Sequence, residues 1–411
     1  MSDSYSPGDI QIQSFNITSK RGNLDLTKSF VSASIYESIF TPGIICDITV
    51  LDTDDILGTM KISGDEDVNI KLKTPGGSSA EYKFGLYTLE ASKTVTASTK
   101  SKTFIIKAVS QEALHAKTNI ISKSFNTQIS NIVKTIHKEY MHSDKQIEVE
   151  ETKGSQIIII PSFNPFKAID MVRKRAVSGE NKSSLFIFFE TRNGSSQVFK
   201  FTTIEKLFKA GSVKTFKQSD AINSNMNNKT DDQILALETP ALFNSSDAIK
   251  AGGKRKTVEF DISTHAVNNS LRDTKSTDYS LGGSGPLVSE DFKSKYINKA
   301  RNQPQSVMPT DSTKPKTGIK ESTPDQQAYL AALMQNSIKM RVYGDFKLKA
   351  GDVITANIPT KTSTTGPRSN DPLMSGKFLI SRIHHDIGTA GDKPRYTCVI
   401  ECLKGNVEKG V

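Results

Sequence analysis

The spacing of apolar residues changes its period twice along this chain, and this change constrains the fold most. Up to residue 110, apolar and polar residues alternate as in strands with one buried face, for example at Val68, Ile70 and Leu72. Between residues 129 and 140 the period becomes helical, and after residue 336 the alternation returns. We therefore predict an α+β, multi-domain fold in which two antiparallel β-barrel or sandwich domains flank a mixed α/β domain.

The predicted domain limits follow from these changes and from local composition. A chain of 411 residues can form about two to four domains. We place a first β domain at 8–110, an α/β domain at 111–240, and a second β domain at 241–270 together with 324–405. Residues 271–323, within a stretch rich in Lys, Ser, Asn, Thr and Asp, are predicted to be a polar extended insertion.

Local signals in the first half predict particular turns and breaks. Apolar residues alternate over 10–12 and continue in the opposite phase over 15–17, which predicts a β-bulge. Asn164 followed by Pro165 predicts a capped helix start, and Asn193 followed by Gly194 predicts a tight hairpin. One helical stripe is formed by Ile129, Ile132, Val133, Ile136 and Tyr140.

The second half gives fewer signals. Residues 254–264 alternate and predict a strand within the polar region, and Thr323 before Pro324 predicts the start of a helix. The stretch RVYGDFKLKAGDVITANIP, residues 341–359, predicts strand, turn, short strand, second turn and strand. It contains no His or Cys, so a role in shape is favoured over a role in chemistry.

The charge of the chain is basic but diffuse. The net charge is +10, yet residues 1–110 carry 11 basic and 13 acidic side chains, while residues 206–323 carry 18 and 13. The densest clusters, 173–175 and 254–256, are interpreted as solvated faces. A DNA reader usually concentrates Lys and Arg on one element with aromatic residues between them, and this chain does not.

No motif predicts catalysis, a cofactor or a metal, so catalytic, cofactor-binding and metal residues are all predicted as none. His384-His385-Asp386 is the best candidate cluster, but neighbouring residues of a strand point to opposite faces and cannot share one ion without a bulge, so a structural or interface role is favoured. His137 is interpreted as a polar flank of its helix, Asp65-Glu66-Asp67 as a turn, and the Gly-rich 281–286 as a linker.

The cysteines and the apolar runs place limits on the environment. Cys46, Cys398 and Cys402 are an odd, sparse set, which argues against a disulfide framework and for buried thiols in a reducing compartment. No window approaches the roughly 18 apolar residues of a membrane span, so none is predicted.

Five segments, taken together and in order, resemble the baseplate hub proteins of contractile-tailed (myovirus) bacteriophages. These proteins are similar to the N-terminal hub part of the VgrG proteins of type VI secretion. Residues 37–72 (ESIFTPGIICDITVLD and onward) resemble the first β domain of that family, and 122–140 its first helix. Residues 163–207 resemble its helix-plus-hairpin segment, and 336–359 with 371–387 its second β domain.

The resemblance implies a structural role and no enzyme activity. In that family both β domains have the fold of the tail-tube subunit, and a homotrimer forms a ring of six similar domains. Such a hub joins the six-fold tail tube to the three-fold central spike and lets DNA pass. Because VgrG proteins continue into a spike and this chain ends at Val411, we expect a separate spike polypeptide.

The implied partners and location follow. They are a hexameric tail-tube or tube-initiator protein, a trimeric central spike protein, surrounding baseplate wedge proteins, and DNA only transiently in the channel. The location is the virion tail baseplate, after assembly in the host cytoplasm. The alternative, favoured by the charge, is a nucleic-acid-binding or adhesion module of a phage tail tip. A cell-wall hydrolase ranks last, since no convincing Glu/Asp pair occurs.

Overall fold

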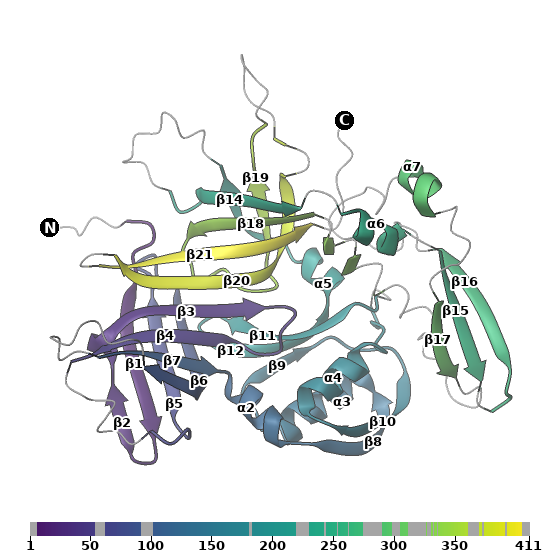
Figure 1. The fold of residues 1–411 in the computed structure, drawn as a ribbon, viewed down its shortest axis with the longest axis horizontal. Helices are drawn as coiled ribbons and strands as arrows, with labels where there is room; N and C mark the ends of the chain where they lie inside the picture. Colours follow the sequence, from purple (N-terminus) through teal and green to yellow (C-terminus); the bar gives the residue numbers. More distant parts are fainter. Residues whose placement is uncertain are drawn as a thin grey trace.

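A computed structural model of the chain describes most of its length. The described residues are 6–53, 62–91, 102–180, 183–218, 230–241, 244–252, 254–261, 263–273, 290–297, 305–310, 326, 330–331, 333–334, 336–360, 370–371, 374–390 and 393–404. They form a fold that is mostly antiparallel β-sheet with few helices (Figure 1).

One large sheet contains strands from both ends of the chain. Its N-terminal strands are β1 (Gln11–Ser19), β2 (Gly22–Asp25), β3 (Phe30–Ser38), β4 (Ile45–Asp52), β5 (Asp67–Lys73), β6 (Ser79–Ala91) and β7 (Lys102–Val109), with the 3-10 turn η1 (Thr27–Ser29). Its later strands are β13 (Ser212–Lys217), β14 (Ile234–Ala241), β18 (Asn336–Tyr343), β19 (Val353–Asn357), β20 (Gly376–Ala390) and β21 (Lys393–Lys404). The order is β14-β18-β21-β20-β3-β4-β7-β6-β5-β1-β2, and β19 joins β13 to β20.

The middle of the chain forms a compact region that lies below β20 and β21 and to the right of β2 and β5 in Figure 1. Its helices are α2 (Gln111–Thr118), α3 (Ile129–Thr135), the π-helical turn η2 (Ile136–Tyr140), α4 (Pro165–Arg173) and α5 (Ile204–Lys209). Its strands are β8 (Ile121–Gln128), β9 (Gln146–Val149), β10 (Ser155–Phe163), β11 (Phe186–Asn193) and β12 (Ser196–Thr203). They pair as β11-β12-β9 and β10-β8.

A separate small sheet stands at the right of Figure 1. It has the order β16-β15-β17, from β15 (Lys254–Asp261), β16 (Val267–Asp273) and β17 (Gln305–Thr310). The helices α6 (Ser245–Gly252) and α7 (Glu290–Phe292) and the π-helical turn η4 (Lys293–Ile297) belong to the same part of the chain. The remainder of the predicted insertion 271–323 lies outside the described residues.

Strand β11 connects two hydrophobic cores. Ile187 and Phe189 pack into the core beneath the large sheet, which contains residues from both ends of the chain. Phe186 and Phe188, on alternate positions, pack into a second core with α3 and α4. A strand buried on both faces holds the middle region against the large sheet.

Several local predictions are confirmed. The register of β1 against β5 shifts between Ile12 and Ser14, where the bulge was predicted. Asn164 caps α4, its side chain accepting a hydrogen bond from the Lys167 N–H at 2.8 Å. β11 and β12 form the hairpin around Gly194, whose φ of 62° suits glycine. The strand predicted at 254–264 is β15.

Other local predictions are wrong or concern residues outside the described ones. Residues 122–128, included in the segment that resembles a helix, belong to strand β8, and the helix begins at Ile129. The short strand predicted within 341–359 is absent, because residues 344–352 form a loop whose carbonyls bind a buried arginine. Most of the helix predicted from Thr323 lies outside the described residues.

We predict that Gly344→Ala strongly destabilises the protein. A methyl group at this position would overlap the ring of Tyr396, which is fully buried and cannot move aside. Overpacking of this kind costs about 1–3 kcal/mol or more. Gly388→Ala is the control, because a Cβ at that position meets no atom within 4 Å. Thermal melting followed by circular dichroism should show a much lower melting temperature for Gly344→Ala and little change for Gly388→Ala. Equal melting temperatures of the two variants would contradict the prediction.

Candidate functional site at the joint of the two β regions

The two ends of the chain meet where β3 pairs with β20. The strands are antiparallel, with register pairs running from Arg382 and Ser38 to Gly388 and Ser32. The Ile39 N–H extends the ladder by donating to the Ser381 carbonyl at 2.9 Å. We call this contact the β3–β20 joint. It makes one continuous sheet from segments more than 340 residues apart in sequence.

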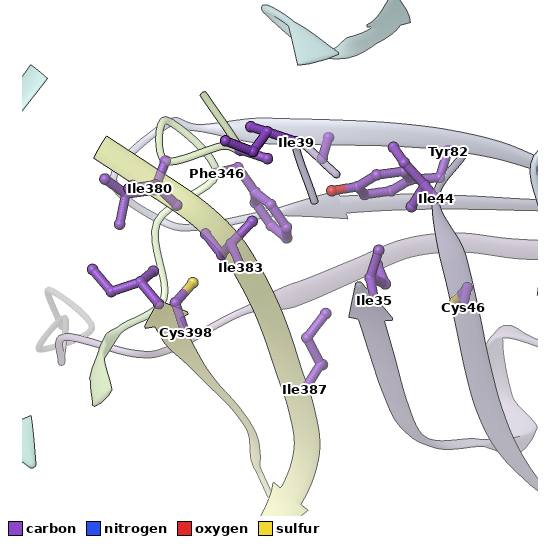
Figure 2. Close-up of a cluster of buried hydrophobic side chains, with 14 of the residues drawn as sticks. Ile35, Ile39, Ile44, Cys46, Tyr82, Phe346, Ile380, Ile383, Ile387 and Cys398 are labelled. Carbon is purple, nitrogen blue, oxygen red and sulfur yellow. The ribbon is translucent and has the colours of Figure 1, made fainter. Parts of the chain in front are cut away.

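The inner face of the joint is apolar and shared. Figure 2 shows Ile35 and Cys46 from the N-terminal strands lying near Ile383, Ile387 and Cys398 from the C-terminal strands. All five side chains are buried. Since neither end could cover these residues alone, burial of apolar surface favours the joint.

Glu37 introduces a charge into this apolar face and is fully buried. The Arg192 Nε donates to its Oε1 at 3.0 Å, and the Tyr82 hydroxyl donates to the same oxygen at 3.0 Å. The Ala350 N–H donates to Oε2 at 3.3 Å, and His385 Nε2 lies 3.5 Å from Oε1. One carboxylate therefore collects partners from four separate segments.

Arg192 uses its remaining donors on the loop between β18 and β19. Its two terminal nitrogens donate to the carbonyls of Phe346 and Leu348, each at 2.8 Å. The guanidinium also lies over the rings of Tyr82 and Phe346, 5.4 and 5.5 Å from their centres. We call Glu37, Arg192, Tyr82 and His385 with these loop carbonyls the joint network.

The charge states in the joint network follow from its contacts. Burial would raise the pKa of Glu37, but the Arg192 guanidinium and His385 outweigh it and hold that pKa well below its usual range. Burial lowers the pKa of His385, so its imidazole is neutral at physiological pH. With its Nδ1 2.6 Å from the Tyr396 hydroxyl, the geometry fits a proton on Nε2, directed at Glu37.

A second buried ion cluster holds β11 against the N-terminal strands. Glu190 accepts from Lys145 Nζ at 2.7 Å, from Gln197 at 2.9 Å and from the Ile44 N–H at 3.2 Å. Lys145 also donates to Glu112 at 2.7 Å. Burial raises the pKa of Glu190, and Lys145 opposes that change.

The outer face of the joint is an open groove of about 750 Å³. Tyr36 and His384 stack across the joint at its centre, with ring centres 4.3 Å apart. Charged side chains on this face of the sheet form ion pairs between strands: Lys339 with Glu238 at 3.1 Å, Arg382 with Glu401 at 2.9 Å, Arg341 with Asp386 at 3.6 Å, and Lys107 with Glu90 at 2.6 Å. The face is therefore close to charge-balanced.

The residues of the cluster predicted from sequence, His384-His385-Asp386, lie on both the groove face and the buried face of the joint. His384 and Asp386 lie on the groove face, and His385 lies on the buried face, so the three do not converge. In the described part of the chain, no three His, Cys, Asp or Glu side chains gather as a metal site. That the chain uses no cofactor or catalytic residue stays a prediction.

Other sequence candidates are structural or lie outside the described residues. Cys46, Cys398 and Cys402 are free and buried as predicted, and burial raises the pKa of each thiol, that of Cys398 to about 11. His137 is wrongly predicted as a flank: it is 4% exposed and packs edge-on against Phe199.

The remaining motifs give no site. In the 65–67 turn, the Glu66 carboxylate accepts from the Gly64 N–H at 2.7 Å. Residues 281–286 lie outside the described residues. Among the helices the structure describes, none is both long and apolar enough to cross a membrane.

Comparison with known proteins identifies the fold. No protein-family model and no curated protein matches the sequence. Among solved structures, a tail protein from Neisseria meningitidis matches with a TM-score of 0.59 and 6% identity, over 96% of this chain and 97% of that one. A 43 kDa prophage tail protein from Shewanella oneidensis matches with 0.53 and 10%, over 96% and 98%.

The chain has the fold of these tail proteins. A type VI secretion component from E. coli, described as similar in structure to bacteriophage T4 tail proteins, also matches, with a TM-score of 0.50 and 10% identity over 98% of this chain and 78% of that one. The predicted resemblance to hub-like tail proteins and VgrG is therefore confirmed at the level of fold.

We predict that Arg192→Met lowers the free energy of unfolding by about 3–5 kcal/mol, because it leaves the Glu37 carboxylate buried without its cation. Adding Glu37→Gln should recover part of the loss. Arg382→Met is the matched control, since its pair with Glu401 is exposed and worth less than about 1 kcal/mol. Denaturant titrations measure the free energy of unfolding of the two single variants and of the double variant. Equal losses of stability in Arg192→Met and Arg382→Met would show that the joint network is unimportant.

We also predict a pH effect at Asp352, which ends the loop of the joint network. Burial, with Glu37 nearby, raises the pKa of Asp352 to about 6. Since the folded state holds this proton more tightly than the unfolded chain, stability from this group is present below about pH 4 and is lost as pH rises through about 6. Asp352→Asn should therefore gain stability relative to the natural chain between those pH values. A constant difference across pH would contradict this.

Proposed function

We propose that the chain is a structural hub of a phage tail baseplate, without catalytic activity. The observation that carries the proposal is the β3–β20 joint, which places the two β regions side by side in one sheet. The similarity of fold to phage tail proteins and to a type VI secretion component supports a structural role in a tail.

The proposal includes the division into domains. As predicted from sequence, the first tube-like β domain is residues 8–110, the α/β domain 111–240, the second tube-like β domain 241–270 with 324–405, and residues 271–323 are an insertion. In the structure, β13 and β14 pair with strands of the second β domain, and β15 lies in the small separate sheet. Three chains then place six similar β domains around one axis, which matches a six-fold tube on one side and a three-fold spike on the other. Tube, spike and wedge proteins are the partners in this scheme.

The proposal also assigns the groove face to a passage for DNA. A surface that DNA crosses must not hold phosphates strongly, because each neutralised phosphate adds affinity. On this face Lys339, Arg341 and Arg382 are each paired with a carboxylate. Paired cations of this kind leave little free positive charge for phosphates.

We predict that the purified chain, alone or with its tail partners, sediments as a trimer of the 45.0 kDa chain. Analytical ultracentrifugation at concentrations well above micromolar measures this, and electron microscopy of a whole tail tip would then locate the protein at the junction of tube and spike. A chain that stays monomeric in both conditions would count decisively against a hub.

The alternative, a nucleic-acid-binding or adhesion module of a phage tail tip, is favoured by the net charge of +10 and by the basic excess of residues 206–323. A salt-titrated binding assay with duplex DNA separates the two functions. A hub should show weak binding near physiological salt. Tight binding with a steep dependence on salt would support the alternative.

A further inference from the structure

A cavity of about 360 Å³ lies beside the groove, where the N-terminal β region meets the helices of the middle region. Its lining includes Ile45 at the start of β4, Val109 at the end of β7, Ala113 and Ala116 on α2, and Phe166 on α4. Ile45 also lines the groove, so the two hollows share part of their rim. We call the smaller hollow the α2 cavity. Its volume lies in the range of about 300–1,000 Å³ that is usual for ligand sites.

The walls of the α2 cavity are mostly apolar. Ile44 and Ala116 are buried and form its floor, whereas Ile45 is 46% exposed at its rim. The space exists because α2 and the segment before β4 present small residues, Ala113, Ala116 and Gly43. At Gly43 an added Cβ would make only ordinary contacts, the nearest at 3.5 Å, so the backbone does not require glycine there. The small residues therefore leave an apolar hollow that a larger side chain from outside can fill.

One charge stands at the mouth of the α2 cavity. Lys117 is exposed and is the only lining residue with a charged side chain. Its Nζ lies 4.3 Å from the centre of the Tyr87 ring, which holds the ammonium in place without neutralising it. Within the described ranges no carboxylate lies at ion-pair distance from Lys117, and the acidic residue of α2, Glu112, is buried against Lys145 and Ser143. The rim therefore has a positive charge available to a ligand.

Asn164 adds hydrogen-bond donors to the same rim. It lines the cavity at the start of α4, and its side-chain oxygen already serves as the cap of that helix, accepting from the Lys167 N–H. The side-chain nitrogen therefore remains as a donor. A carboxylate at the rim can accept from Asn164 and pair with Lys117. On the groove face, in contrast, Lys339 and Arg382 each have a carboxylate of the chain beside them.

We propose that the α2 cavity docks a segment of a partner protein in which a carboxylate lies next to a bulky apolar side chain. The apolar side chain enters the cavity and buries its surface against Ile44, Val109 and Phe166, which supplies affinity. The carboxylate stays at the rim with Lys117 and Asn164, which fixes the orientation of the segment. All of these residues belong to a single chain. The site therefore goes beyond the proposed hub function and does not depend on the number of copies.

A second copy of this chain is a poor occupant of the cavity. Among the described residues, three large apolar side chains are exposed and have an acidic residue directly beside them in sequence: Tyr36, Leu51 and Phe260. The acidic neighbours are all buried: Glu37, Asp52, Glu259 and Asp261. None of the three can offer an apolar side chain and an accessible carboxylate together. The charge at the rim therefore favours a different protein as the partner.

Tryptophan fluorescence of a short peptide measures this docking directly, because the chain itself contains no Trp. One synthetic peptide carries Trp between two Asp residues, and a second carries Trp between two Lys residues. We expect the Asp peptide to bind the purified chain saturably, with its emission shifted to shorter wavelength as the indole leaves water. It should bind about tenfold more tightly than the Lys peptide, whose charge is the same as that of Lys117.

Two variants and a control assign the binding to the α2 cavity. Lys117→Glu should reverse the preference between the two peptides, and Ala113→Phe, which fills the cavity, should weaken binding of the Asp peptide about tenfold or more. Lys134→Glu makes the same charge change at an exposed position of α3 that does not line the cavity, and should leave binding unchanged.

The outcomes are distinct from those of the trimer experiment. Loss of binding in Ala113→Phe together with reversed preference in Lys117→Glu supports the site. Absence of saturable binding up to millimolar Asp peptide overturns it, as does binding that neither variant changes. Circular dichroism melts confirm that each variant is folded, and if Ala113→Phe is not, the preference measured in Lys117→Glu decides alone.

Discussion

The buried ion pair between Glu37 and Arg192 is the constraint on which the rest of the arrangement depends. Glu37 lies on β3, Arg192 on β11, and the guanidinium is completed by carbonyls of the loop before β19. Removing both ions from water costs several kcal/mol each, so such a pair is a poor source of stability alone. Here nearly every donor has an acceptor, and those acceptors come from both ends and the middle of the chain. The pair is satisfied only when all three parts are correctly placed, so it selects one arrangement over other compact ones.

Along β3 and β20, side chains alternate between the buried face of the joint and its groove face. On β3, Ile35 and Glu37 face inward while Tyr36 faces the groove; on β20, Ile383 and His385 face inward while His384 faces the groove. A shift of register by one residue would exchange these faces and bury Tyr36 and Arg382 in place of the joint network. The inward charges therefore fix the register that also sets the paired charges of the groove. The balanced charge of the groove face therefore depends on the buried pair of Glu37 and Arg192, which does not lie on that face.

Much of the local fold could be predicted from sequence, because alternation and turn chemistry are local. The bulge after Ile12, the cap at Asn164 and the hairpin at Gly194 each follow from a few neighbouring residues. The joint network could not be predicted. Glu37 and Arg192 each stand at the polar end of a β-rich run, where a charged residue normally marks a solvent-exposed strand end. Only the long-range pairing of β3 with β20 and the packing of β11 bury them. The short strand predicted between the two turns of 341–359 is wrong for the same reason, since the carbonyls of Phe346 and Leu348 accept from Arg192 and not from a neighbouring strand.

The bent strands β6 and β20 explain why one chain leaves edges open. A straight strand has the same two neighbours along its length, but a bulge turns β20 so that its first half pairs with β19 and its second half with β3. The bulge in β6 makes the same turn, and within the described residues no strand pairs with that edge of its second half.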